Sequence, residues 1–127
     1  MLLRREFIGS AAMALLATGC RTPMEDLNDA PELYGLIGQM SAVPGKRDEL
    51  ISYLLAGTKG MPGNLSYLIS KDIAHADAIW IVEMWKDKAA HGASLALPQV
   101  QAAIAKARPI LAGFGTRAEV IPVGGKQ

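Results

Sequence analysis

Residues 65–85 read LSYLISKDIAHADAIWIVEMW, and this stretch decides the fold. Its first part alternates, which places Leu65, Tyr67 and Ile69 on one side of an extended chain. Its last eight residues are almost wholly apolar, as in a strand buried on both sides. A short polar connection separates the two parts. The stretch therefore predicts two strands, over 65–72 and 78–85, that pair as an antiparallel hairpin.

The segment before this hairpin predicts a strand and a helix. Residues 33–43 form an apolar run with glycines at 35 and 38, typical of a strand approached closely by another group. Residues 46–57 follow a proline and a glycine, start with four charged residues and end at Gly57. Their apolar positions fall on one helical face, which favours an amphipathic helix.

The segment after the hairpin predicts two helices and a final strand. Asp87 can cap a helix that runs through residue 97, and Pro98 suits the first turn of another. Apolar residues keep a helical spacing from Val100 to Leu111, although Pro109 kinks or ends this second helix. Residues 117–123 then predict a short strand at a sheet edge, because they contain a proline.

The element order β-α-β-β-α-β is that of an α+β, ferredoxin-like domain, in which a four-stranded antiparallel sheet carries helices on one face. The other face stays uncovered in a domain of about a hundred residues, which is small for an isolated core. We therefore expect a homodimer that packs two such faces together.

Composition limits the partners. The 127 residues include 13 basic and 12 acidic side chains spread along the chain, so no nucleic-acid-binding surface is indicated. The hydrophobic fraction of 50% is typical of one globular domain. The chain has one cysteine, which excludes an intramolecular disulfide, and two histidines without metal spacing, so we expect no metal site.

Residues 1–20 have the pattern of an export signal. Residues 4–8, RREFI, resemble a twin-arginine signal, and residues 17–20, ATGC, resemble a lipobox. The expected mature chain is exported to the periplasm or cell surface and held at a membrane only by lipid on Cys20. A signal cleaved without lipidation and an ordinary amphipathic amino terminus are the alternatives.

The rest of the chain then divides into three parts. Residues 21–32 mix charges with prolines and predict a tether, residues 33–123 the folded domain, and residues 124–127 a tail.

Several short motifs in the domain resemble one family. They are Glu83-Met84-Trp85, the run KDKAAH that ends at His91, Ser94-Leu95, and Arg108-Pro109. With the element order, they resemble the antibiotic-biosynthesis monooxygenase superfamily, in particular its quinol-monooxygenase-like branch. That resemblance implies a dimeric α/β barrel with the ligand cavity between each subunit's sheet and its own helices.

The resemblance also implies a chemistry without flavin or metal. A small aromatic quinol or phenol loses a proton, and the resulting anion reduces O₂. By this analogy His91 is the base or hydrogen-bond donor, Trp85 the aromatic wall, and Glu83 a group that orients a ring N–H or accepts the substrate hydroxyl. Tyr67, Ile81 and Ser94 are the substrate-binding candidates. Alternation places Glu83 and Trp85 on the same side of the strand as Ile81.

Simpler roles are open for the same residues. Trp85 and Tyr67 can be core residues, His91 a packing residue, and Glu83 the partner of a cation at 106 or 108.

Other functions are open as well. Some oxygenases of this superfamily carry an asparagine at the position of Ile81 and an arginine at that of Ala105. Haem binding or degradation, with haem as cofactor, and a non-catalytic ligand-binding dimer are therefore the alternative functions.

Overall fold

The computed structural model describes residues 32–126. The expected export signal with Cys20 and all but the last residue of the tether lie outside the described residues. The elements are β1 (Tyr34–Ala42), α2 (Arg47–Gly57), β2 (Asn64–Lys71), β3 (Ala78–Trp85), α3 (Lys88–Ser94), α4 (Pro98–Ala107) and β4 (Leu111–Val120). No helix in this part of the chain is both long and apolar enough to cross a membrane.

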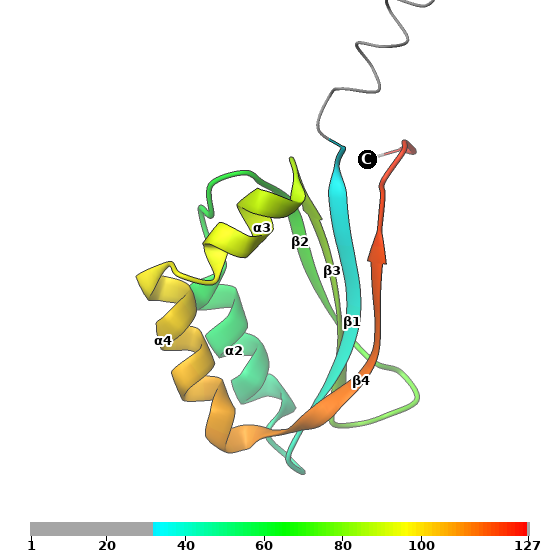
Figure 1. The fold of residues 1–127 in the computed structure, drawn as a ribbon. Helices are drawn as coiled ribbons and strands as arrows, with labels where there is room; N and C mark the ends of the chain where they lie inside the picture. Colours follow the sequence, from blue (N-terminus) through cyan, green and yellow to red (C-terminus); the bar gives the residue numbers. More distant parts are fainter. Residues whose placement is uncertain (1–31, 127) are drawn as a thin grey trace, which may run out of the picture. The chain divides into compact units, whose positions relative to one another are not determined.

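The strands form one antiparallel sheet in the order β2-β3-β1-β4, so β1 lies between β3 and β4. All three helices lie on the same face of this sheet, with α2 and α4 side by side (Figure 1). This arrangement confirms the predicted ferredoxin-like α+β fold.

The β2–β3 hairpin forms as predicted, and its connection is held by one carboxylate. The Asp72 side chain accepts hydrogen bonds from the backbone N–H groups of Ala74 and His75, at 2.7 and 3.0 Å. It also accepts from the indole of Trp80 at 2.7 Å and from the Gln39 amide at 2.9 Å, which ties the hairpin to β1. The Trp80 bond is the largest cause of a lowered Asp72 pKa.

One face assignment within the hairpin was wrong. Tyr67 and Ile69 pack on the core, but Leu65 is 54% exposed. The pairing of β2 with β3 shifts between Asn64 and Ser66. This irregularity breaks the strict alternation on which the assignment of Leu65 relied.

The carboxyl-terminal boundaries also differ from the prediction. The first helix after the hairpin ends at Ser94, before residue 97, and α4 ends at Ala107. A 3-10 turn follows, and β4 begins at Leu111, six residues earlier than expected. The helix cannot continue because Pro109 lacks an N–H group. Leu111 therefore belongs to the sheet rather than to a helical face, and Pro122 lies beyond the strand.

The helices meet the sheet through two groups of buried side chains. Leu50, Ile79 and Ile81 lie in the group under α2 and α4, and Leu36 and Trp85 lie in the group near α3. Among residues 32–126, no helix covers the opposite face of the sheet, and Leu68 and Val82 are 58% and 42% exposed there (Figure 1). The predicted uncovered face is therefore present.

Candidate active site

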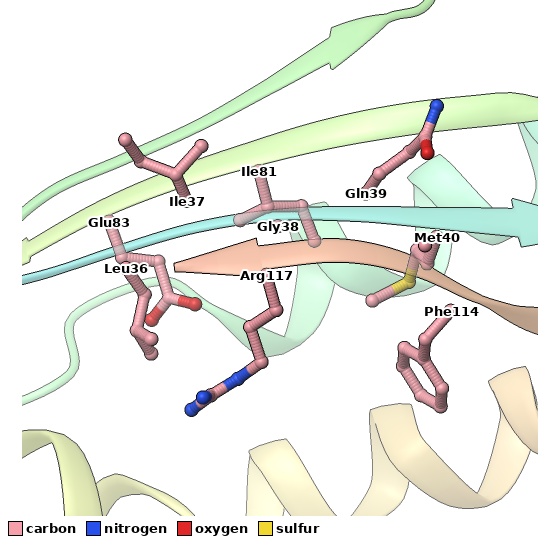
Figure 2. Close-up of a pocket in the computed structure, with 10 residues that line it drawn as sticks. Leu36, Ile37, Gly38, Gln39, Met40, Ile81, Glu83, Phe114 and Arg117 are labelled. Carbon is pink, nitrogen blue, oxygen red and sulfur yellow. The ribbon is translucent and has the colours of Figure 1, made fainter. Parts of the chain in front are cut away.

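An apolar cavity of about 400 Å³ lies against the helix side of the sheet; we call it the first cavity. The residues around it include Leu36, Gly38 and Met40 from β1, Ile81 and Glu83 from β3, and Phe114 and Arg117 from β4. Figure 2 shows Leu36, Met40, Phe114 and Arg117 pointing to this side, whereas Ile37 and Gln39 point away. Its volume falls in the range of small-molecule sites.

Gly38 provides the open floor of the first cavity. It alternates with Leu36 and Met40 along β1 and pairs with Ile81 on one side and Arg117 on the other. A Cβ atom there would meet only the Thr116 carbonyl oxygen, 4.0 Å away. The missing side chain therefore leaves space that a flat ligand can fill.

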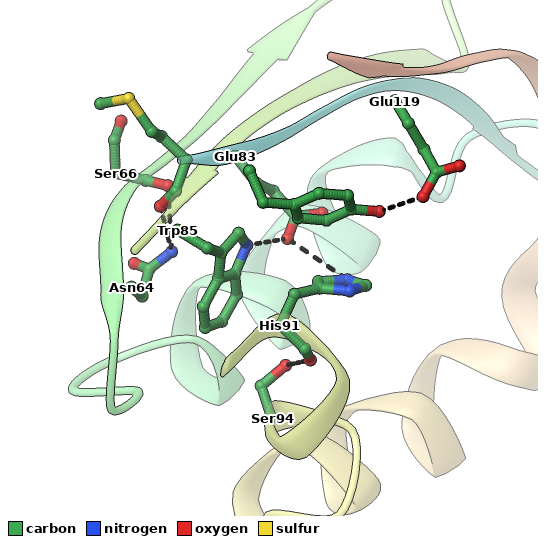
Figure 3. A network of polar contacts seen from close by, with 9 residues as sticks. Asn64, Ser66, Glu83, Trp85, His91, Ser94 and Glu119 are labelled. Carbon is green, nitrogen blue, oxygen red and sulfur yellow. Dashed lines mark hydrogen bonds and ion pairs between the residues drawn. The ribbon is translucent and has the colours of Figure 1, made fainter. Parts of the chain in front are cut away.

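Glu83 is the carboxylate at the border of this apolar space. Its side chain is 15% exposed, and its Oε1 accepts a hydrogen bond from Trp85 Nε1 at 2.9 Å. His91 Nε2 lies 3.9 Å from the same oxygen, which is an ion-pair distance if the imidazole is protonated (Figure 3). Burial raises the Glu83 pKa, against the smaller opposing effects of Trp85, His91 and Arg117.

Aromatic packing fixes His91 beside this carboxylate. Its ring lies 5.5 Å from Trp85 in an edge-on arrangement and 5.4 Å from Tyr34. Helix α3, which carries His91, is capped by Asp87, whose side chain accepts a hydrogen bond from Ala90 N at 2.7 Å. The predicted helix cap is thus present, and it holds the first turn that presents the imidazole.

Tyr34 connects this cluster to the end of β4. Its hydroxyl donates to Glu119 at 2.6 Å, and Lys88 lies 3.3 Å from the same carboxylate. Burial and the bond to Glu119 raise the Tyr34 pKa, while that bond lowers the pKa of the exposed Glu119. Through the Tyr34 and His91 rings, these contacts connect Glu83 to a polar group of side chains at the end of β4.

A second cavity, of about 710 Å³, lies between the sheet and helices α2 and α4. Tyr67 borders it, and Met40 and Phe114 border both cavities, so the two spaces adjoin. Burial is the main cause of a raised Tyr67 pKa, and the Glu83 charge adds to it. Tyr67 therefore stays protonated at neutral pH and can donate a hydrogen bond.

The predicted site residues are only partly brought together. Glu83, Trp85 and His91 are in contact, but of the three only Glu83 borders either of these two cavities. Ile81 borders the first cavity and Tyr67 the second. Ser94 is buried and its hydroxyl donates to the His91 carbonyl at 2.6 Å, so it supports α3 from within.

The alternative prediction for Glu83, an ion pair with Lys106 or Arg108, was wrong. Among the described residues, Glu83 contacts Trp85 and His91, and no ion pair joins it to Lys106 or Arg108. In the same range, no three side chains of the metal-ligating types gather in one place.

Three residues of the site were missed by sequence reasoning. Arg117 and Phe114 were overlooked because the last strand was expected to start at 117, which hid its alternation with β1. Tyr34 carried a usable signal, since it alternates with Leu36 and Gly38 along the first strand.

Comparison with known proteins identifies the family. The model of the antibiotic biosynthesis monooxygenase family matches residues 33–106. A Chloroflexus aurantiacus structure bearing the same family name is 50% identical, with a TM-score of 0.73, over 75% of this chain and 97% of that one. No curated protein sequence matches.

Two more distant structures share the fold. One, from Caulobacter crescentus, has 17% identity and a TM-score of 0.67 over 80% of this chain and 99% of its own. The other is SnoaB from Streptomyces nogalater, with 11% identity and a TM-score of 0.60 over 74% of this chain and 96% of its own. Given the family match and the 50% identity, the chain belongs to the antibiotic biosynthesis monooxygenase family.

Proposed function

We propose that this protein oxidises a small electron-rich aromatic compound, such as a quinol, with O₂ and without a bound flavin or metal. One observation carries the proposal: a shielded carboxylate, Glu83, borders an apolar cavity of about 400 Å³ and lies 3.9 Å from His91 Nε2. A carboxylate that is itself shielded from water, at the border of an apolar cavity, can accept the proton of a phenolic hydroxyl bound there.

The ring of the substrate would lie over Gly38, with its hydroxyl toward Glu83. The carboxylate accepts the hydroxyl proton, and its raised pKa makes it a stronger base than a solvated carboxylate. The neighbouring imidazole of His91 can then take up that proton. Met40 and Ile81 give the ring of the anion apolar walls.

The substrate supplies all four electrons that O₂ accepts, two from oxidation of the quinol to the quinone and two from conversion of a ring C–H to C–OH. One oxygen atom enters the ring and the other leaves as water. For 1,4-naphthohydroquinone the balanced outcome is 2-hydroxy-1,4-naphthoquinone and water, with no further reductant. The likeness to SnoaB supports this reading, because that Streptomyces protein is described as a cofactor-independent oxygenase.

Oxygen uptake by the full chain with 1,4-naphthohydroquinone tests the proposal. We expect uptake above the autoxidation rate and a loss of about 100-fold or more in Glu83→Gln, the range of a general base. Asp48→Asn is the matched control, since this carboxylate is exposed and pairs with Lys71. Uptake no faster than autoxidation, or equal rates in both variants, would refute the proposal.

We further propose that two copies pack through the uncovered sheet face. The exposure of Leu68 and Val82 on that face supports this dimer. Light scattering of Val82→Lys against the wild type tests it. A dimeric wild type and a monomeric variant are expected, and a monomeric wild type would contradict the proposal.

The membrane anchor also stays a proposal. Lipid on Cys20 would place the domain at a membrane, where quinols are dissolved. Cell fractionation of Cys20→Ala tests this, and we expect the variant to leave the membrane fraction. Continued retention there would rule the anchor out.

A further inference from the structure

Arg117 places a positive charge on the lining of the first cavity. It lies on β4 directly opposite Gly38, and Figure 2 shows its guanidinium on the side of the sheet to which Glu83 also points. Among residues 32–126, no carboxylate oxygen lies within 4.0 Å of this guanidinium, and the nearby Glu119 is paired with Lys88 instead. Within the described domain, the guanidinium is therefore exposed and held in no close ion pair.

The field of this charge reaches the other polar groups of the site. Burial raises the pKa of Glu83 and of Tyr34, and the Arg117 charge opposes both shifts. It also adds to the lowering of the Glu119 pKa, after the bonds from Tyr34 and Lys88. An ionised oxygen next to Glu83 would be repelled by that carboxylate unless a cation lay nearby. Arg117 is the cation that borders the same cavity.

We propose that Arg117 binds an ionised oxygen on the aromatic ring of the ligand, so that the site prefers phenolates and enolates over neutral rings. The inference rests on the proposed function, in which the deprotonated quinol and the hydroxyquinone product both carry such an oxygen. The planar guanidinium can donate two parallel hydrogen bonds to it, or to an oxygen and its neighbour on the ring. The apolar part of the cavity, around Gly38 and Met40, holds the ring itself.

A pair of probes of nearly equal size separates charge from shape. 2-Hydroxy-1,4-naphthoquinone is an anion at pH 7, and 2-methoxy-1,4-naphthoquinone is neutral. Calorimetric titration of the full chain should show tighter binding of the anion. In Arg117→Gln this preference should fall by about tenfold, the scale of a hydrogen bond to a charged group, while binding of the methoxy compound changes little.

Two further variants identify the cause. Arg117→Lys keeps the charge without the planar fork and should retain part of the preference. Lys59→Gln removes one charge from an exposed position that borders neither cavity, and should keep all of it. Circular dichroism confirms that each variant is folded. Equal losses for both probes in Arg117→Gln, no preference in the wild type, or no binding of either probe would overturn the proposal.

The same titration separates this inference from the proposed function. A charge preference that depends on Arg117, in a protein without oxygen uptake, would keep the anion site and reject the oxygenase. Oxygen uptake that is unchanged in Arg117→Gln, together with no charge preference, would keep the oxygenase and reject the anion site.

Discussion

A side chain added at Gly38 should weaken ligand binding without lowering the stability of the fold. Gly38→Leu adds four carbons at a position where a Cβ atom has only one neighbour, at 4.0 Å. The φ angle of Gly38 lies outside the left-handed range, so a leucine fits the backbone. Replacing glycine within a strand stabilises the fold by roughly 0.5–1 kcal/mol. The folded protein should therefore be at least as stable as the wild type.

The same change should weaken ligand binding. The four added carbons occupy part of a cavity of about 400 Å³, which is already near the lower end of small-molecule sites, so less space remains for a ring. A ring forced into the remainder overpacks the site at a cost of roughly 1–3 kcal/mol, which weakens binding roughly 5- to 150-fold.

Calorimetric titration with 2-hydroxy-1,4-naphthoquinone and thermal unfolding measure the two effects. Gly124→Leu adds the same side chain where no atom lies within 4 Å of a Cβ, and it should change neither quantity. Unchanged affinity in Gly38→Leu would show that the ligand does not lie over β1. A large loss of stability would show that the space is not open.

Three further changes test the site and its supports. Because the Glu83 pKa is raised on folding, the native state binds more protons there, and stability falls as pH rises from about 4.5 through the folded pKa. Chemical denaturation across pH measures this, and Glu83→Gln should lack the fall. Identical pH profiles for the wild type and the variant would contradict the raised pKa. Asp87→Ala should lower the free energy of unfolding by about 1 kcal/mol because α3 loses its cap, whereas Asp87→Asn should lower it little. Urea titration measures both values, and equal losses would argue against the cap. Gly57→Ala places a Cβ 2.5 Å from Ala103 Cβ and should lower the free energy of unfolding by roughly 1–3 kcal/mol. Gly92→Ala meets no atom within 4 Å and should stabilise α3 by roughly 0.5–1 kcal/mol. Thermal unfolding measures both, and a Gly57→Ala variant more stable than Gly92→Ala would contradict the close packing of α2 on α4.

Local patterns predicted most of the fold. The alternation in 65–85 and the cap at Asp87 act between residues close in the chain, so they are readable without a structure. The end of α4 and the start of β4 were less readable. Apolar residues from Val100 to Leu111 fit a helical spacing, and only the loss of an N–H at Pro109 and pairing with β1 decide the boundary.

The sequence by itself determined that Glu83 and Trp85 share a face with Ile81, because side chains alternate along any strand. It also placed His91 one turn into a helix that follows this strand. Only the tertiary structure set Arg117 opposite Gly38 and brought it to the same cavity as Glu83. These residues come from strands far apart in the chain, and their register is fixed by packing and pairing rather than by any local preference.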